Sequence, residues 1–455
     1  SSSVAILVQV FFAQGPQAAH APPGVRHCPP RGASASGALG AMSVVVTSPT
    51  AGIVLLLGAL VALGTWPAMM DVCTLYKRNS THIYLDYATG DLLLATLLAL
   101  TLGSLGPASP ENPSFFVQVA DIDRNWPSVL SALAGGALLM FGNLTLQIAL
   151  TMGTSLGVIL PIQGALCVII STTINYALNP DANDPTLLFT GMFFFLLAIL
   201  ASSCAEVGYK GFLANYELEH PKGIAVRRAE RKTKAGAEAS KAQDERFPDG
   251  GEPQASAEAS EEGRAESSNG EVEGELVDEA ATIRAKQQSS AVVRGLVVAS
   301  CGGVAFGFFS PLFNIGVNDQ FRWLPEGTVH LTGWTANFYF GVSFWFWAHV
   351  VGFARIGGSA SAALKAYVQD HDKRALAVAT GMVCCLGNTM QFLGGMAAGF
   401  ATCDMVQAFP LVGILWGMLL FGEFRKAPLS VKALLVGVYI VYIIAVALLA
   451  LSVNA

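Results

Sequence analysis

The sequence predicts an all-α membrane protein with ten transmembrane helices, arranged as two inverted repeats of five. Hydrophobic residues make up 53% of its 455 residues and charged residues only 13%, whereas soluble domains carry roughly 25% charge. Ten apolar runs are long enough to cross a bilayer, and the second five repeat motifs of the first five. A soluble enzyme of this composition would expose large apolar patches, so that class is excluded.

The ten predicted spans are helices because about 20 apolar residues in a helix cross a hydrocarbon core of roughly 30 Å with every backbone group paired. Transmembrane strands are excluded, since the runs are continuous rather than alternating. The spans cover residues 50–71, 84–105, 127–149, 153–178, 186–207, 292–316, 332–354, 375–398, 403–422 and 431–452.

Composition divides the chain into four parts. Residues 1–41 precede Met42 and are expected to be disordered or a non-native leader. Residues 42–208 and 291–455 hold five spans each. The segment 209–290 between them is rich in Glu, Ala, Ser and Gly, so a disordered, charged loop is expected there. A solvated linker is its simplest role, and contact of its basic start with anionic lipid is the alternative.

Lys and Arg residues predict the orientation through the positive-inside rule. Twelve of them lie near the membrane in the loops after spans one, five, seven and nine, against Arg124 and Arg322 in the loops after the even-numbered spans. The central loop is therefore expected in the cytoplasm and both termini outside.

Motifs of the first half recur in the second. Pro67 stands 75 residues before Gly142, Pro311 stands 76 residues before Gly387, and an Asn follows each glycine. Because five is odd, the second copy enters the membrane from the opposite side, which is typical of secondary transporters. Chance recurrence of Gly and Pro is the alternative. Proline permits a helix to bend, and the predicted hinges are Pro67, Pro161, Pro311 and Pro410.

Carboxylates in or beside the spans are candidates for proton coupling. A charge near the bilayer centre costs about 2.5–3.5 kcal/mol on insertion scales, so each needs a reason to be there. Asp86 is the preferred carrier, and Asp404 and Glu423, at the two ends of the ninth span, are further candidates, as is Asp91. The alternative for each is a position at a helix end, where Asp404 would favour the helix dipole and Glu423 would pair with a neighbouring Arg or Lys.

Side-chain amides are predicted to line a central substrate site. Asn143 and Gln147 share one helix face, as do Asn388 and Gln391. Amides offer donors and acceptors without charge, which suits a small neutral nitrogen heterocycle with alternating N–H and C=O groups. Interhelical hydrogen bonding, worth about 0.6 kcal/mol on average, is the alternative. Further candidates are Asn314 and Gln407, with Trp66 and Tyr87 stacking on a planar ring.

The sequence lacks the motifs expected for a metal site, a nucleotide phosphate site or nucleic-acid binding. The eight Cys form no CxxC pair, no Gly-Lys pair supports a phosphate loop, and no basic stripe suggests nucleic acid. Gly153–Gly157 matches GxSxG, but no strand precedes it. The expected partners are therefore the lipid bilayer and a small solute, with no cofactor beyond a coupling proton, no metal and no enzymatic activity.

Distinctive motifs occur in most spans: Gly64–Met69, Tyr84–Tyr87, Asn125–Val129, Phe309–Asn314, Gly387–Ala398 and Val406–Phe424. These stretches resemble the plant ureide permeases of the drug/metabolite transporter superfamily. The resemblance covers most of 50–453 outside the central loop. The positions that match are Trp66, Pro67, Asp86, Asn143, Asn314, Asn388, Gln391, Gln407 and Glu423.

The resemblance implies ten helices, outside termini, and proton-coupled import of allantoin and related oxo-heterocycles such as uracil, mostly at the plasma membrane. The central loop lacks the Walker-A-like segment described for family members, so no nucleotide role is implied. Two rival functions stay open. One is an exporter or exchanger of another small metabolite, and the other is a membrane receptor or scaffold that acts through the central loop.

Overall fold

The computed structural model describes residues 46–74, 78–104, 113–152, 156–219, 270–420 and 422–454, all of which belong to one unit, 42–455. The predicted leader (1–41) and residues 220–269 of the predicted central loop lie outside the described residues. Every regular element in the described segments is helical, which confirms the predicted all-α class.

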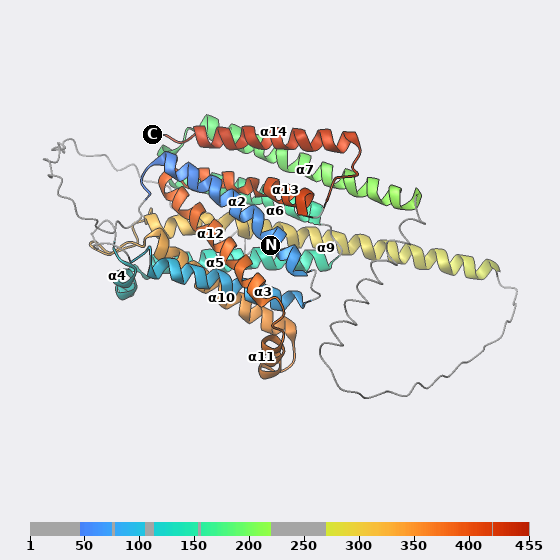
Figure 1. Cartoon of the computed structure of the whole chain (residues 1–455), viewed down its shortest axis with the longest axis horizontal. Helices are drawn as coiled ribbons and strands as arrows, with labels where there is room; N and C mark the ends of the chain where they lie inside the picture. The colour runs from blue at the N-terminus through green and yellow to red at the C-terminus, as the bar shows by residue number, and fades with distance from the viewer. Residues whose placement is uncertain are drawn as a thin grey trace. The chain divides into compact units, whose positions relative to one another are not determined.

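Ten long helices and four short ones make up the described fold (Figure 1). The short ones are α4 (Phe115–Ala120), η1 (Pro180–Ala182), α11 (Ala360–Gln369) and the 3-10 helix η2 (Thr402–Ala408). The long ones are α2 (Pro49–Thr74), α3 (Ser80–Leu100), α5 (Ile122–Thr151), α6 (Leu156–Leu178), α7 (Pro185–Glu219), α9 (Gly270–Asn318), α10 (Gly333–Ile356), α12 (Arg374–Ala398), α13 (Phe409–Leu420) and α14 (Leu429–Leu451).

Nine helical segments of the described residues are long and apolar enough to cross a membrane, against the ten spans predicted. The predicted span 332–354 corresponds to α10, which is not among the nine. Its Trp and Tyr side chains, Trp334, Tyr339, Trp345 and Trp347, lower the mean hydropathy, although 24 residues reach about 36 Å at 1.5 Å per residue. The membrane assignment of α10 therefore rests on its length and neighbours.

Most helix boundaries differ from the predicted ones by a few residues, and the differences are largest in the predicted span 403–422, at the end of α7 and at the start of α9. The predicted span 403–422 begins as the 3-10 helix η2 and ends at Leu420. Helix α7 continues eleven residues beyond 208, where an i,i+4 ion pair between Glu206 and Lys210 supports it at its polar end. Helix α9 begins at Gly270, inside the segment predicted to be a disordered loop.

The helices pack in a consistent set of pairs. Helix α12 packs on α2 and α3, and α5 packs on α9 and α10. Helix α13 packs on α2, α6 packs on α9, and α3 contacts α10. Helices α7 and α14 lie side by side at one edge of the bundle (Figure 1).

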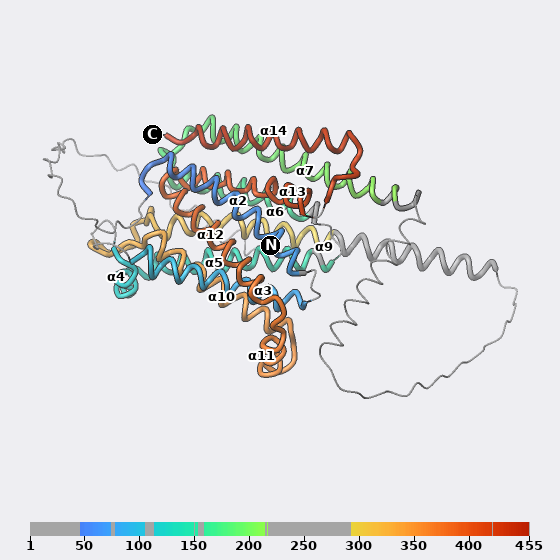
Figure 2. The backbone as a smooth tube through the Cα atoms, in the orientation of Figure 1, coloured from blue at the N-terminus to red at the C-terminus, as the bar shows by residue number. Residues whose placement is uncertain are grey.

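Helix direction alternates along the chain, which gives the bundle two named ends (Figure 2). At the α11 end, α2, α5, α7, α10 and α13 finish and α3, α6, α12 and α14 start. At the α4 end, α3, α6, α9, α12 and α14 finish and α5, α7 and α10 start. Both described termini, residues 46 and 454, therefore belong to the α4 end.

Glycines allow α12 to lie directly against its two neighbours. A methyl group on Gly381 would overlap the carbonyl oxygen of Tyr87 in α3, and one on Gly90 would overlap that of Val378 in α12. On the other side, Gly394 of α12 meets Gly52 of α2, where a methyl group on Gly394 would lie only 2.8 Å from the Gly52 carbonyl oxygen. Small residues are the usual means of such close helix contacts in lipid.

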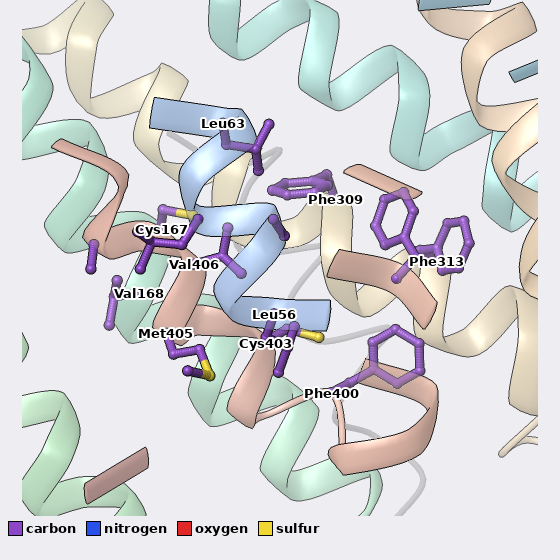
Figure 3. Close-up of a cluster of buried hydrophobic side chains, with 14 of the residues drawn as sticks. Leu56, Leu63, Cys167, Val168, Phe309, Phe313, Phe400, Cys403, Met405 and Val406 are labelled. Carbon is purple, nitrogen blue, oxygen red and sulfur yellow. The ribbon is translucent and has the colours of Figure 1, made fainter. Parts of the chain in front are cut away.

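The main hydrophobic core surrounds η2. Figure 3 shows Cys403, Met405 and Val406 of η2 among Leu56 and Leu63 of α2 and side chains of α6 and α9. Towards the α4 end, Phe313 of α9 stacks on Phe392 of α12, with ring centroids 3.6 Å apart. The 3-10 helix is thus enclosed on several sides, and its polar side chains Thr402 and Asp404 are removed from water.

Candidate functional site

A buried ion pair surrounds Asp86 at the α11 end. Arg78 Nη2 lies 2.6 Å from Asp86 Oδ2, and neither side chain is more than 2% exposed. Arg374 Nε lies 3.2 Å from Oδ1, and the Tyr367 hydroxyl donates to Oδ1 at 2.5 Å. Two guanidinium groups and a phenol thus supply the ion-pair and hydrogen-bond partners that a buried carboxyl group needs.

A second carboxylate extends this ion-pair cluster, which comprises Arg78, His82, Asp86, Tyr367, Asp370 and Arg374. Arg78 Nε lies 3.0 Å from Asp370 Oδ1, and His82 Nδ1 lies 2.6 Å from Oδ2. Burial acts to raise the pKa of Asp370, but the hydrogen bond to His82 and the Arg78 charge outweigh it and hold the pKa below its usual value. Burial, with the adjacent Asp86, raises the pKa of Tyr367 to about 12. The cluster therefore ties the start of α3 to α11 and α12 through charges that persist at neutral pH.

Aromatic rings and a thiol connect three of the predicted substrate-binding residues. The Trp66 and Tyr87 rings are 5.3 Å apart between centroids, and Phe344 of α10 packs on Tyr87 at 5.9 Å. The Tyr87 hydroxyl donates to Cys384 Sγ at 2.9 Å, and Asn388 Nδ2 approaches the same sulfur at 3.7 Å. Helices α2, α3 and α12 thus bring Trp66, Tyr87 and Asn388 into one neighbourhood.

The two residues of the predicted pair, Asn143 and Gln147, have different hydrogen-bond partners. Asn143 is 8% exposed and donates to the Leu139 carbonyl of its own helix. Gln147 accepts a 2.7 Å hydrogen bond from Arg355 Nη1 and lines a small pocket between α3, α5 and α10, together with Tyr84. Helices α5 and α12 are not among the extensively packed pairs, and among the described residues no hydrogen bond joins the two predicted amide pairs.

Asn314 is itself buried and belongs to an amide network that extends from buried Asn175 to exposed Asn318. Its Nδ2 donates to Asn175 Oδ1 at 3.0 Å, and its Oδ1 accepts from Asn318 at 2.7 Å and from Gln320 at 2.5 Å. Asn175 in turn donates to Ser171 at 3.2 Å and to a serine of α9 at 3.3 Å. The predicted binding residue Asn314 is therefore engaged within the protein.

Asp404 is a buried carboxyl without a cation. It is 1% exposed, and its Oδ2 accepts a 2.6 Å hydrogen bond from Thr172 of α6, while Oδ1 has no hydrogen-bond partner. In the part of the chain that the structure describes, no Lys, Arg or His forms an ion pair with it. Burying an ionised carboxylate in this way costs free energy that the protonated form avoids.

Two predicted amides lie near Asp404. Gln391 of α12 is 1% exposed, its Nε2 has no hydrogen-bond partner, and its carbonyl accepts from Cys403 Sγ at 3.4 Å. Gln407 lies on η2 itself and is partly exposed. Through Cys403, the residue before Asp404, the 3-10 helix contacts the backbone of Gln391, and both the Gln391 side-chain nitrogen and Asp404 Oδ1 have no hydrogen-bond partner.

Glu423 is exposed and lies in a turn beyond the end of α13, where its backbone N–H donates to the Gly417 carbonyl at 3.0 Å. Partial burial, with the nearby carboxylates of Glu206 and Asp71, raises the pKa of Glu423, and Lys210 opposes this. Glu423 therefore lies at the α11 end of the bundle, whereas Asp404 lies in the bundle interior.

The four predicted hinges occupy two kinds of position. Pro67, Pro161 and Pro311 lie inside α2, α6 and α9, where each removes one internal backbone hydrogen bond. Pro410 is the second residue of α13, directly after η2, where no intrahelical N–H is needed. Their function as hinges stays a prediction.

Several residues in these clusters were not singled out as site residues from the sequence: Thr172, Ser171, Cys384, Tyr367, Arg78 and Arg374. The run Ser171–Thr173 places three hydroxyl groups inside an apolar span, and this pattern could have indicated hydrogen-bond donors within the bundle. The two arginines entered only as indicators of orientation. Among the described residues, no group of three or more His, Cys, Asp or Glu side chains could hold a metal ion.

Long apolar helices around a buried, polar and largely uncharged interior define a multi-pass membrane protein. The sequence model of a family described as ureide permease matches residues 83–452. The chain therefore belongs to the ureide permease family. It is 34% identical to Ureide permease 5 and to Ureide permease 1 of Arabidopsis thaliana, over 90% of this chain and 95% and 98% of those proteins. It is also 34% identical to Probable ureide permease A3 of Vigna unguiculata, over 81% of this chain and 94% of that protein.

Proposed function

We propose that this protein is a secondary active transporter that imports allantoin and related neutral oxo-heterocycles, such as uracil, by proton symport across the plasma membrane. The observation that carries the proposal is Asp404, a fully buried carboxyl without a cation, set among amides and hydroxyls. A group of this kind can take up a proton on one side of a membrane and release it on the other. The names of the relatives support ureides as the solute class.

The proposed architecture is ten spans in two inverted halves, α2 to α7 and α9 to α14. The helix pairs support it, because exchanging the halves leaves the pattern unchanged. The pair α2–α12 becomes α9–α5, α3–α12 becomes α10–α5, and α13–α2 becomes α6–α9. The pairs α3–α10 and α7–α14 become themselves, as a two-fold relation between the halves requires.

The proposed substrate site is the neighbourhood of Trp66, Tyr87 and Asn388, with Asn143 and Gln391 as amides of the surrounding interior. Stacked aromatic rings suit a planar heterocycle. Buried amides reject a solute that lacks matching donors and acceptors, because an unpaired buried amide costs about 1–3 kcal/mol. Asn314, Gln147 and Gln407 contribute to the walls of the site and not to its centre.

The coupling proton is assigned to Asp404 in preference to Asp86 and Glu423. Asp86 is paired with Arg78 and Arg374, so its proposed role is to lock the α11 end closed. The α11 end also carries Arg355, Lys365 and other basic residues, which supports a cytoplasmic position. Bending at the helix prolines would alternate access between this end and the other.

Uptake of radiolabelled allantoin and uracil in cells that express the chain tests the proposal. Expected results are uptake that rises as external pH falls, collapses with a protonophore, and is mutually competitive between the two solutes. Asp404→Asn is expected to abolish concentrative uptake while retaining exchange of preloaded solute, and Asp181→Asn, at an exposed position, is the matched control. Uptake indifferent to external pH and to the protonophore would remove the coupling, and no uptake of either solute would favour an exporter or a scaffold.

A further inference from the structure

Each half of the chain carries a short helix between its second and third long helices. In the first half this helix is α4, between α3 and α5, and in the second half it is α11, between α10 and α12. The exchange of halves that replaces α3 by α10 and α5 by α12 therefore also replaces α4 by α11. Helix α10 begins beside α4 and ends beside α11 (Figure 1). The two short helices are thus equivalent elements at opposite ends of the bundle.

The sequence repeats itself where each short helix ends. An Asp-x-Asp motif occurs there in both halves, and an arginine follows it one residue later in the first half and two residues later in the second. The first of these aspartates, Asp121 or Asp370, is the residue directly after the short helix. The arginine, Arg124 or Arg374, lies in the first turn of the next long helix. The two ends of the bundle therefore place the same residue types at corresponding positions.

At the α11 end, these residues bind the start of α3 through charged side chains. Asp370 Oδ1 lies 3.0 Å from Arg78 Nε, and Arg374 Nε lies 3.2 Å from Asp86 Oδ1. The Tyr367 hydroxyl of α11 donates to the same Asp86 oxygen. Helix α11 and the start of α12 thus fasten the second half of the chain to the first half at this end.

At the α4 end, a neutral side chain binds the start of α10. Gln118 of α4 is 0% exposed, its Oε1 accepts from the Thr332 N–H at 2.7 Å, and its Nε2 donates to the Thr332 hydroxyl at 3.2 Å. Thr332 is the N-cap residue of α10, and the first N–H groups of a helix need partners from outside the helix. Gln118 therefore holds the start of α10 through both ends of its amide.

Two further residues bind the segment that leads into α10. Asp121 Oδ2 accepts from the Val329 N–H at 3.1 Å, and Arg124 Nη2 donates to the Glu326 carbonyl at 2.9 Å. The aspartate and arginine that bind charged side chains at the α11 end thus have counterparts that bind main-chain groups at the α4 end. We call Gln118, Asp121 and Arg124 the α4 latch.

The two ends differ in how much their contacts resist separation. Both sets of contacts are formed in this one structure, whereas alternating access requires one end to open while the other stays closed. Water can replace the partners of a neutral hydrogen bond, so the net contribution of such a bond is modest. Breaking a buried ion pair by removing one partner leaves an uncompensated charge. The α4 latch is therefore the easier of the two contacts to open.

We propose that the α4 latch is the gate through which solute enters the bundle, and that Gln118 is the residue that holds this gate closed. The proposal rests on the proposed transport function and identifies the contact that breaks at the outer end. Opening separates α4 from the start of α10 while α11 stays bound to α3. The interior around Tyr87 and Asn388 then becomes accessible from the α4 end.

Cys384 is a natural reporter of this accessibility. It is 3% exposed and contacts Tyr87 and Asn388 in the proposed substrate site. Intact cells that express the full chain are treated with a membrane-impermeant maleimide, and modification at Cys384 is followed by tandem mass spectrometry. The other cysteines stay in place. Because every variant carries the same thiol, the relative labelling rate measures how often the site is open to the outside.

Gln118→Ala removes both hydrogen bonds to Thr332. The expected result is a rise of about tenfold in the labelling rate, which corresponds to about 1.4 kcal/mol, as for one or two net hydrogen bonds. Thr332→Val removes the hydroxyl alone and should give a smaller rise, which keeps the test available if Gln118→Ala fails to reach the surface.

Two other glutamines provide matched controls. Gln369→Ala changes an exposed residue at the end of α11. Gln163→Ala truncates a side chain that is 1% exposed and lies in the half of α6 nearer the α11 end. Both variants are expected to label at the wild-type rate.

The outcomes separate this inference from the proposed function. An unchanged rate in the Gln118 and Thr332 variants that reach the surface overturns the latch. An equal rise in Gln163→Ala also overturns it, because the effect would then be a general loosening of the bundle. Labelling needs no solute, so variants that label as expected in a chain that takes up neither allantoin nor uracil support the latch and overturn the proposed function.

Discussion

Replacing Arg78 by Met is expected to destabilise the protein far more than the same change at Arg374. Arg78 is 2% exposed and bonds to Asp86 at 2.6 Å, to Asp370 Oδ1 at 3.0 Å and to the Asp370 carbonyl at 2.6 Å. Removing one partner of a buried pair costs about 3–5 kcal/mol, since the other charge stays buried. Arg374 is 32% exposed and lies 3.2 Å from Asp86, so solvent screening reduces its loss to about 1 kcal/mol.

The assay is unfolding in mixed detergent micelles, with the free energy of unfolding measured for both variants and for Asp86→Asn. Combining Arg78→Met with Asp86→Asn gives a double-mutant cycle, in which a coupling energy of at least about 1.5 kcal/mol is expected for groups in direct contact. A loss below about 1 kcal/mol for Arg78→Met, or a coupling near zero, would refute the reasoning that this pair is the energetic centre of the ion-pair cluster.

Four further predictions concern other parts of the molecule. Asp86→Asn is expected to retain proton-dependent uptake, measured as the ratio of rates at two external pH values, whereas a loss of that dependence would return the coupling role to Asp86. Thr172→Val removes the 2.6 Å donor to Asp404 and should raise the half-maximal pH of uptake, and an unchanged profile would contradict the assignment. Gly381→Ala, which would overlap the Tyr87 carbonyl, should cost more than about 3 kcal/mol of stability, while Gly413→Ala, with nothing within 4 Å, is neutral or stabilising by up to about 1 kcal/mol. Glu423→Gln should stabilise the protein at neutral pH, because the folded-state pKa of Glu423 is raised. A carboxyl whose pKa is raised by folding destabilises the protein once it ionises, and it has no such effect below its ordinary pKa of 4.5. The stability gained by Glu423→Gln should therefore vanish below pH 4.5, and a gain that persists there would point to another cause.

The helices could be predicted from the sequence because membrane spans are set by local composition and length. Helix α10 illustrates the limit, since its Trp, Tyr, Asn337 and His349 side chains lower its mean hydropathy although it packs on both α3 and α5. The 3-10 helix η2 could not be predicted. Its polar residues Thr402 and Asp404 are bound by Asn183 and Thr172 from distant parts of the chain, and such contacts decide the local backbone.

The sequence allowed us to predict which types of residue form the site, but not which residues bind one another. Because Asp86 and Asn314 lie in apolar helices, the sequence indicates that their side chains need ion-pair or hydrogen-bond partners. The sequence does not identify those partners. Asp86 is paired with Arg374, 288 residues away along the chain, and Asn314 with Asn175, 139 residues away. Only the folded arrangement separates a carboxyl neutralised by arginines from one, Asp404, that is left without a cation.

The glycine contacts of α12 have a mechanical consequence. Where Gly394 meets Gly52, the Leu56 side chain of α2 also lies against Gly394, and Leu63 of α2 fits over Gly387 in the same way. Side chains seated over glycines must disengage before one helix can translate past another. Helices α12 and α2 are therefore expected to move as one unit, and the charges that anchor the first turn of α12 connect that unit to the α11 end.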